Sequence, residues 1–138
     1  HGARNYPFKK ERSDLDVALE DGTGDAAYLD RLTTHLEAVI DRNRPDLIFY
    51  LAGVDPVEGD RFGKLSLTRA GLEARERFVL ETATSRGISM AIVLSGGYAS
   101  SHIETASLHA VVHRVAAEMG PSHRTILNRS EPKLGMSV

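Results

Sequence analysis

The stretch DLIFYLAG, residues 46–53, is a continuous apolar run that ends in a glycine. A short run of this kind, without alternating polar residues, predicts a β-strand that is buried on both faces of a parallel sheet. A second apolar run, ISMAIVL, occupies residues 88–94 and is followed by the pair Gly96 and Gly97. The two runs therefore predict two strands at the centre of the fold.

Helical segments surround these two strands. Apolar residues recur at helical spacing between about residues 25 and 42 and predict a helix there. They would form one face of it and are Leu29, Leu32, Leu36, Val39 and Ile40. Thr68 is a candidate N-cap for a second helix over residues 69–85, and Ser101 is one for a third that runs to about residue 118. The order helix, strand, helix, strand, helix predicts an α/β fold with a parallel crossover.

Length, composition and charge narrow the class of protein. The 138 residues, 41% of them hydrophobic and 26% charged, fit one globular domain over residues 1–120 with a polar tail over residues 121–138 that we expect to be poorly ordered. A formal net charge of −2 gives no reason to expect nucleic acid as a partner. No apolar run is long enough to span a membrane. The absence of cysteine fits a cytoplasmic protein.

Chemistry is expected where the two strands end. In open parallel sheets, ligands bind outside the carboxyl ends of the strands. The loop after the first strand carries Asp55, and the loop after the second carries Gly96, Gly97 and Tyr98. We therefore expect Asp55 and Tyr98 to face the same crevice.

The residues alone leave the roles of these groups open. Asp55, kept extended by the proline that follows it, is a candidate metal ligand or forms a local Asx turn. The glycine pair allows a ligand to approach the backbone closely or forms a tight turn. Tyr98 can donate a hydrogen bond to a developing oxyanion, or its ring packs at the rim.

Two further polar groups favour structural interpretations. His109 and His113 lie four residues apart on the third predicted helix, a spacing that can hold a metal. Without the glutamate of an H-E-x-x-H motif, we expect them to be exposed residues on the helix face. In the loop EGDRFGKL, we expect Glu58, Asp60 and Arg61 to form surface pairs or to hold the shape of the loop.

Four motifs resemble those of the zinc-dependent histone deacetylase superfamily, and of its bacterial class IV-like members in particular. They are HGARNYPF, DGTGD, PDLIFYLAGVDPVEGDRFGKLSLT and SGGYA, and they occur in family order over residues 1–116. The resemblance implies a three-layer αβα fold of the arginase/deacetylase type around a parallel sheet. Residues 1–120 are then the C-terminal portion of that domain. The implied reaction is hydrolysis of the acetyl-amide bond of acetylated lysine or a related acetylated amine.

The resemblance also implies a role for each candidate residue. Asp55 is then a ligand of zinc or another divalent metal, Tyr98 stabilises the tetrahedral oxyanion, and Gly96 and Gly97 line the acetyl-lysine channel. The family's other two zinc ligands form an Asp-x-His motif upstream, and this sequence does not contain it. Since a catalytic zinc typically has three protein ligands, we expect this chain alone to be inactive.

Two alternatives to a deacetylase of acetyl-lysine remain from the sequence. One is an incomplete fragment or interaction module, because two central strands are few for a parallel sheet. Such a chain is expected to associate with the missing N-terminal part of the same protein or, as a homo-oligomer, with another copy. The other is a relative that acts on acetylated polyamines or other small amides.

Overall fold

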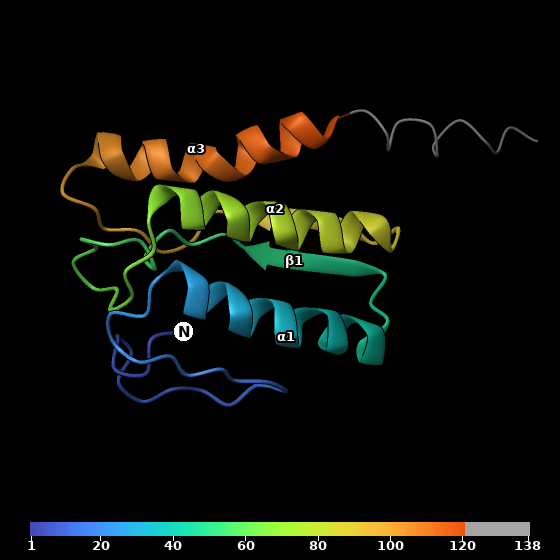
Figure 1. The fold of residues 1–138 in the computed structure, drawn as a ribbon, viewed down its shortest axis with the longest axis horizontal. Coiled ribbons are helices and arrows are strands. Elements are labelled where there is room, and N and C mark those ends of the chain that lie inside the picture. The colour runs from blue at the N-terminus through green and yellow to red at the C-terminus, as the bar shows by residue number, and fades with distance from the viewer. Residues whose placement is uncertain (121–138) are drawn as a thin grey trace, which may run out of the picture.

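The computed structural model describes residues 1–120, in which helices and strands alternate along the chain (Figure 1). The elements are α1 (Asp25–Asn43), β1 (Leu47–Leu51), α2 (Arg69–Ser85), β2 (Ser89–Val93) and α3 (His102–Met119). This confirms the order and type of the predicted elements. The prediction for the tail at 121–138 lies outside the described residues. None of the helices in residues 1–120 has the length and apolar character needed to cross a membrane.

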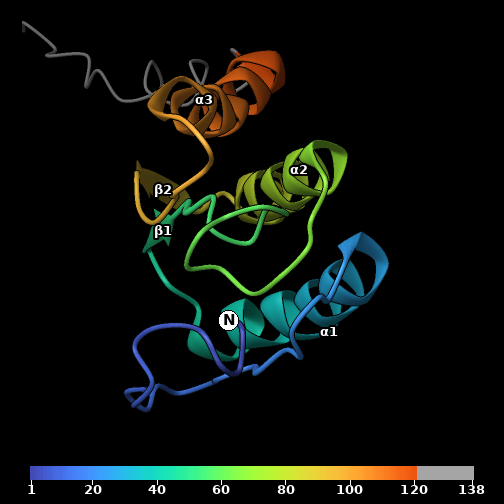
Figure 2. The same cartoon turned by 90° about the vertical axis from the view of Figure 1, so that its left-hand side faces the viewer.

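β1 and β2 form a parallel pair, with Leu47 opposite Ser89 and Leu51 opposite Val93. The connection between them runs through α2, which confirms the predicted parallel crossover. α2 lies between α1 and α3 and contacts both of them, and it also contacts β2 (Figure 2). The helices therefore form one layer beside the sheet.

The main core lies where the sheet and its carboxyl-terminal loops meet α2 and α3. Its fully enclosed members come from the loop after β1 and from the two helices; they are Ala52, Val54, Leu72, Leu80, Leu108, Val111, Val112 and Val115. Tyr50 of β1 and Ile92 of β2 pack against this cluster. The core thus begins directly beneath the loops that leave the strands.

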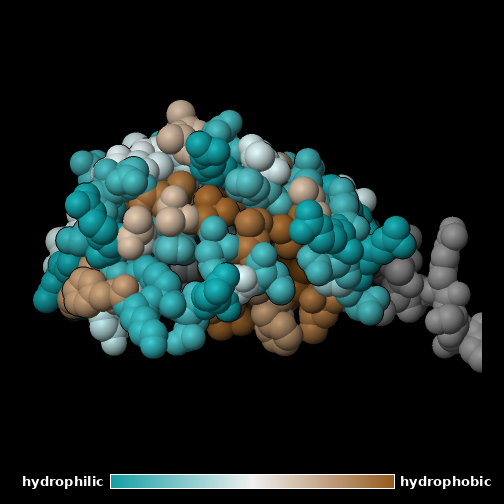
Figure 3. All heavy atoms as spheres, turned by 90° about the horizontal axis from the view of Figure 1, so that it is seen from below, coloured by the Kyte–Doolittle hydropathy of each residue, from teal (hydrophilic) through white to brown (hydrophobic). Residues whose placement is uncertain are grey.

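The other face of β1 is open in residues 1–120. Leu47, Phe49 and Leu51 are 48%, 65% and 63% exposed, whereas Ile48 and Tyr50 are half-buried. The prediction that this strand is buried on both faces is therefore wrong for the described residues, because the helices cover only one face. Figure 3 shows apolar side chains reaching the surface on the side seen from below Figure 1.

Side chains at the starts of two helices confirm the predicted caps. The Thr68 hydroxyl accepts a hydrogen bond from the Gly71 amide (3.0 Å), and the Ser101 hydroxyl accepts one from the Glu104 amide (3.1 Å). These bonds satisfy amides that have no partner within their helix. They fix where α2 and α3 begin, and therefore how long the preceding loops are.

A buried polar cluster joins α2 to β1. Arg75 and Glu76 of α2 are 4% and 1% exposed and form an ion pair of 2.5 Å. The Tyr50 hydroxyl donates a hydrogen bond of 2.6 Å to Glu76 Oε2. Burial raises the pKa of Tyr50 above its usual value, so that the phenol stays protonated and can donate. A buried carboxylate requires such partners, and these come from both elements.

Replacing Tyr50 with phenylalanine tests this cluster. Tyr50→Phe leaves Glu76 Oε2 without its donor in a buried position, so the free energy of unfolding should fall by about 1–3 kcal/mol. Urea denaturation of the chain measures the change. The control Tyr6→Phe alters a tyrosine that is 73% exposed and should leave stability unchanged. Equal stability of Tyr50→Phe and the unaltered chain would contradict the role of the cluster.

Candidate functional site

The loops at the carboxyl ends of β1 and β2 continue side by side after the strands end. The Ala52 amide donates to the Val93 carbonyl (2.9 Å), and the Val54 amide donates to the Gly96 carbonyl (2.6 Å). The second of these bonds lies beyond both strands. It brings the residues that follow Val54 next to the glycine pair, as the topology predicts.

The Asp55 carboxylate lies against two glycines. A Cβ atom built on Gly53 or on Gly96 would stand 2.7 Å from Asp55 Oδ1, which is closer than such atoms approach in proteins. A side chain at either position would therefore displace the carboxylate. Among residues 1–120, the group that approaches the backbone of Gly96 is the Asp55 side chain, and the approach of a ligand to Gly96 stays a prediction.

Asp55, Gly96 and Tyr98 line one pocket of about 710 Å³. The rings of Tyr6, Phe8 and Phe62 contribute to the same lining, so that the pocket has four aromatic side chains in total. Gly97 is placed differently. It lines a neighbouring pocket of about 690 Å³ together with Tyr98 and the first turns of α3.

Tyr98 is 54% exposed, and its ring packs edge-on against that of Phe62 with the centroids 4.8 Å apart. Within residues 1–120 no hydrogen bond engages its hydroxyl. The hydroxyl is therefore available to a ligand in the pocket. A phenol in this position can donate a hydrogen bond to a negatively charged oxygen.

The loop EGDRFGKL has the structural role that its sequence favours. Asp60 Oδ1 accepts hydrogen bonds from the amides of Phe62 (2.9 Å) and Gly63 (2.7 Å). A Cβ atom on Gly63 would overlap the Asp55 carbonyl oxygen, at 1.8 Å. The loop therefore folds on itself around Asp60 and passes directly against the backbone of Asp55.

The two helix histidines differ in their surroundings. His113 is exposed, as predicted, but His109 is half-buried, and its Nδ1 is buried without a hydrogen-bond partner among residues 1–120. The prediction is wrong for His109 because α3 packs over the turn that follows β2: a Cβ atom on Gly97 would lie 3.2 Å from His109 Nε2. Burial, aided by the nearby charge of Arg75, lowers the pKa of His109.

The described residues do not form a complete metal site. Within residues 1–120, no three side chains of histidine, cysteine, aspartate or glutamate lie close enough together to hold a metal ion. Asp55 offers one carboxylate in a pocket, which fits a single ligand of a zinc site. A zinc site that used Asp55 would therefore need ligands from outside these residues.

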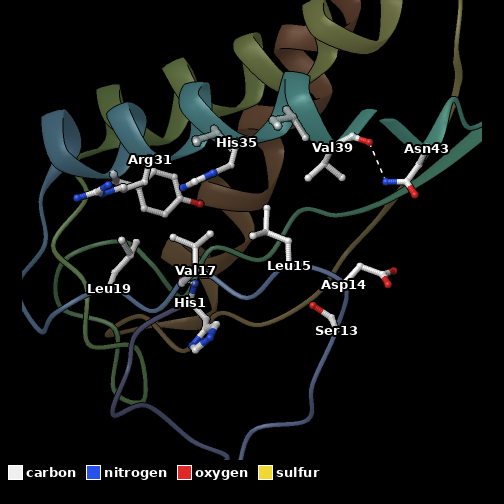
Figure 4. A pocket seen from close by; sticks show the side chains of 13 residues that line it. His1, Ser13, Asp14, Leu15, Val17, Leu19, Arg31, His35, Val39 and Asn43 are labelled. Carbon is white, nitrogen blue, oxygen red and sulfur yellow. Dashed lines mark hydrogen bonds between the residues drawn. The ribbon is translucent and has the colours of Figure 1, made fainter. Parts of the chain in front are cut away.

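A second concave region lies between the N-terminal segment and α1 (Figure 4). This groove of about 400 Å³ is lined mainly by apolar side chains, among them Leu15, Val17 and Leu19 opposite Val39. His35 also borders it. It shares no lining residue with the pocket of Asp55 and Tyr98. We assign the candidate chemistry to the pocket of Asp55 and Tyr98, because both candidate residues line it and neither lines the groove.

Comparison with known proteins shows the family to which the chain is related. Residues 3–114 match the histone deacetylase domain. A protein of Picosynechococcus sp. is 44% identical over 119 residues, which make up 86% of this chain and 40% of that protein. Histone deacetylase 2 of Arabidopsis thaliana is 33% identical over 99 residues, or 70% of this chain and 26% of that protein. The chain thus spans less than half the length of these relatives.

The fold is similar to that of a solved enzyme. The crystal structure of acetylpolyamine aminohydrolase from Burkholderia pseudomallei superposes with a TM-score of 0.70 over 88% of this chain and 37% of that one, at 21% identity. This likeness confirms the predicted αβα arginase/deacetylase-like fold, of which residues 1–120 supply the β1–β2 pair and the helices on one face. The sequence match over residues 3–114 and the shared fold together show that the chain belongs to the histone deacetylase domain family.

Proposed function

We propose that the chain contributes the pocket of Asp55 and Tyr98 to a zinc-dependent hydrolase that cleaves the acetyl-amide bond of acetylated lysine side chains. The observation that carries the proposal is the shared lining: the carboxylate of Asp55 and the phenol of Tyr98 line one pocket, and they come from the loops that follow two adjacent parallel strands. Membership of the histone deacetylase domain family supports the class of reaction.

In this proposal Asp55 is one of the ligands of zinc, and residues outside 1–120 supply the others. When bound there, zinc would supply Lewis-acid chemistry for the acetyl carbonyl and for the attacking water. Gly53 and Gly96 leave the room that this position of Asp55 needs, since a side chain on either would stand too close to its Oδ1. A chain that lacks the remaining ligands is inactive by itself.

Tyr98 and the three other aromatic side chains of the pocket, which we call its aromatic walls, account for the remaining interactions with the substrate. As water attacks the acetyl carbon, negative charge develops on the carbonyl oxygen, and the Tyr98 hydroxyl donates a hydrogen bond to it. The rings of Tyr6, Phe8 and Phe62 offer apolar surface to the methylene groups of a lysine side chain. Gly96 lines the same pocket and leaves room for the Asp55 carboxylate beside it.

The same groups suit an acetylated polyamine, whose acetyl-amide bond and alkyl chain are chemically alike. The solved neighbour named above is called an acetylpolyamine aminohydrolase, although its likeness to this chain lies in the fold. Parallel assays on an acetyl-lysine peptide and on an N-acetylated diamine separate the two substrates. We propose the lysine side chain as the preferred one.

The open face of β1 favours a further role in association. Leu47, Phe49 and Leu51 present contiguous apolar surface, and within residues 1–120 β1 pairs only with β2. Exposed apolar patches of this kind mark interaction sites. We propose that the polypeptide carrying the remaining zinc ligands covers this face, with a second copy of the chain as the alternative occupant.

Association through this face can be tested on the chain produced alone. It should bind a hydrophobic dye and scatter light as a species larger than a monomer. Phe49→Lys should reduce both signals without unfolding the chain, because Phe49 is 65% exposed. Ile103→Lys, which alters a residue on α3 that is 71% exposed, is the control and should change neither. A monomer that binds no dye would refute the proposal.

Removal of the Tyr98 hydroxyl tests its catalytic role. In the complete protein, Tyr98→Phe should lower the rate of deacetylation of an acetyl-lysine peptide on the order of a hundredfold or more, because one oxyanion donor is lost. Zinc content should stay the same. Tyr28→Phe, on α1 and outside the pocket, is the matched control. Undiminished turnover in Tyr98→Phe would rule out the assigned role.

Removal of the Asp55 carboxylate tests its role as a ligand. Asp55→Ala in the complete protein should lose bound zinc, because the site is left with two protein ligands. Metal analysis after dialysis measures the loss. Asp46→Ala removes an exposed carboxylate that precedes β1 and should leave the zinc content unchanged. Full retention of zinc by Asp55→Ala would contradict the assignment.

A further inference from the structure

Three consecutive residues of the loop between β1 and α2 hold three different parts of Tyr98. Asp60 Oδ2 accepts a hydrogen bond of 2.5 Å from the Tyr98 amide. The Arg61 amide donates one of 3.1 Å to the Tyr98 carbonyl. The Phe62 ring meets the Tyr98 ring edge-on, at an interplanar angle of 89°. The amide, carbonyl and ring of Tyr98 are thus all in contact with one loop.

We propose that Asp60 is a positioning residue that fixes the orientation of Tyr98 in the pocket. The inference rests on the proposed function of Tyr98 as the oxyanion donor. Asp60 is not among the residues that line the pocket with Asp55 and Tyr98, so it acts through Tyr98 and not on the substrate.

The Asp60 carboxylate joins two segments that are distant in sequence. Oδ1 bonds the amides of Phe62 and Gly63 within its own loop, whereas Oδ2 reaches across to Tyr98, 38 residues away. Hydrogen bonds from amides to a carboxylate are charge-assisted and stronger than neutral ones. The Asp60 side chain therefore stabilises the shape of its own loop and also binds that loop to the turn after β2.

Tyr98 needs such support because its own turn provides little. It follows two glycines, which restrict the backbone less than any other residue, and half of its surface is open. Its hydroxyl has no bond within residues 1–120 that could fix the ring. Displacing a catalytic group by about 1 Å can cost about a hundredfold in rate. The contacts of Asp60, Arg61 and Phe62 with Tyr98 would prevent that displacement.

The same loop also touches Asp55. Gly63 runs so close to the Asp55 carbonyl that a Cβ atom would overlap it. Asp60 is thus placed between the two proposed functional residues, bonded to the Gly63 amide on one side and to Tyr98 on the other. Through this arrangement it keeps Tyr98 in register with Asp55.

The test exchanges the carboxylate for an amide of the same size. In Asp60→Asn, one oxygen that accepts an amide hydrogen becomes an NH₂ group that cannot. In the complete protein we expect kcat to fall about 10- to 100-fold, with KM and zinc content unchanged. In the Tyr98→Phe background the same substitution should lower kcat no further. Glu58→Gln, an exposed carboxylate in the same loop, is the matched control and should leave kcat unaltered.

A second readout does not depend on activity. Hydrogen exchange of the Tyr98 amide, followed by NMR on this chain, should be at least about 10-fold faster in Asp60→Asn than in Glu58→Gln, because the bond that protects it is lost. Unchanged exchange would overturn the proposal, as would a loss of kcat that adds fully to that of Tyr98→Phe. If Asp60→Asn unfolds the chain, Asp60→Ser replaces it, because a serine hydroxyl can still accept from the amides of the loop but has no second oxygen for Tyr98; unchanged exchange of the Tyr98 amide would again overturn the proposal.

The two proposals fail in distinguishable ways. If Tyr98→Phe retains full turnover, the oxyanion role of Tyr98 is wrong, while the exchange experiment still decides whether Asp60 holds its amide. If Tyr98→Phe is inactive but Asp60→Asn is fully active, only the positioning role of Asp60 is wrong.

Discussion

The hydrogen bond from the Val54 amide to the Gly96 carbonyl continues the parallel pairing of β1 and β2 past the ends of both strands. The two loops can run this close together because Gly53 and Gly96, which face each other across them, have no side chains. Asp55 then lies against Gly96, and Tyr98 follows two residues later into the same pocket. The candidate site is therefore a direct consequence of parallel strand pairing and of glycine at its edge.

The surroundings of this bond are closely packed on one side and exposed on the other. Beneath the loops, Ala52 and Val54 are enclosed by α2 and α3, and the buried Arg75–Glu76 pair links α2 to Tyr50 of β1. On the opposite face β1 presents apolar side chains to solvent. The chain spans less than half the length of the relatives it matches. Within residues 1–120 the sheet consists of two strands.

Periodicity and turn chemistry predicted the elements because these depend on neighbours in sequence. The strand order followed from chain direction, and it placed Asp55 beside Tyr98 without reference to any family. The residues alone leave their roles open, between ligand and turn for Asp55 and between donor and rim aromatic for Tyr98. The resemblance implies the first of each, and both roles stay predictions.

What the sequence could not predict depends on contacts between distant segments. The hydrogen bond between Asp60 and Tyr98 joins residues 38 positions apart in the sequence, and the one from Tyr50 to Glu76 joins residues 26 positions apart. In the sequence, Arg75 and Glu76 resemble charges that face solvent, because the spacing of apolar residues does not reveal a buried charge pair. Their burial becomes clear only once Tyr50 is seen to bind Glu76. His109 is half-buried for a similar reason, because α3 covers the turn of Gly97. The open face of β1 was not predictable for the same reason, because an apolar run does not reveal which segments pack on each face of the strand.

The most direct test of the account is a crystal structure of the complete Tyr98→Phe protein with zinc and an acetyl-lysine peptide. The account predicts that the acetyl group lies between the Asp55 carboxylate and the ring at position 98, with the lysine side chain along Gly96 and the aromatic walls. An acetyl group bound elsewhere, or an Asp55 carboxylate that does not contact the zinc, would contradict it.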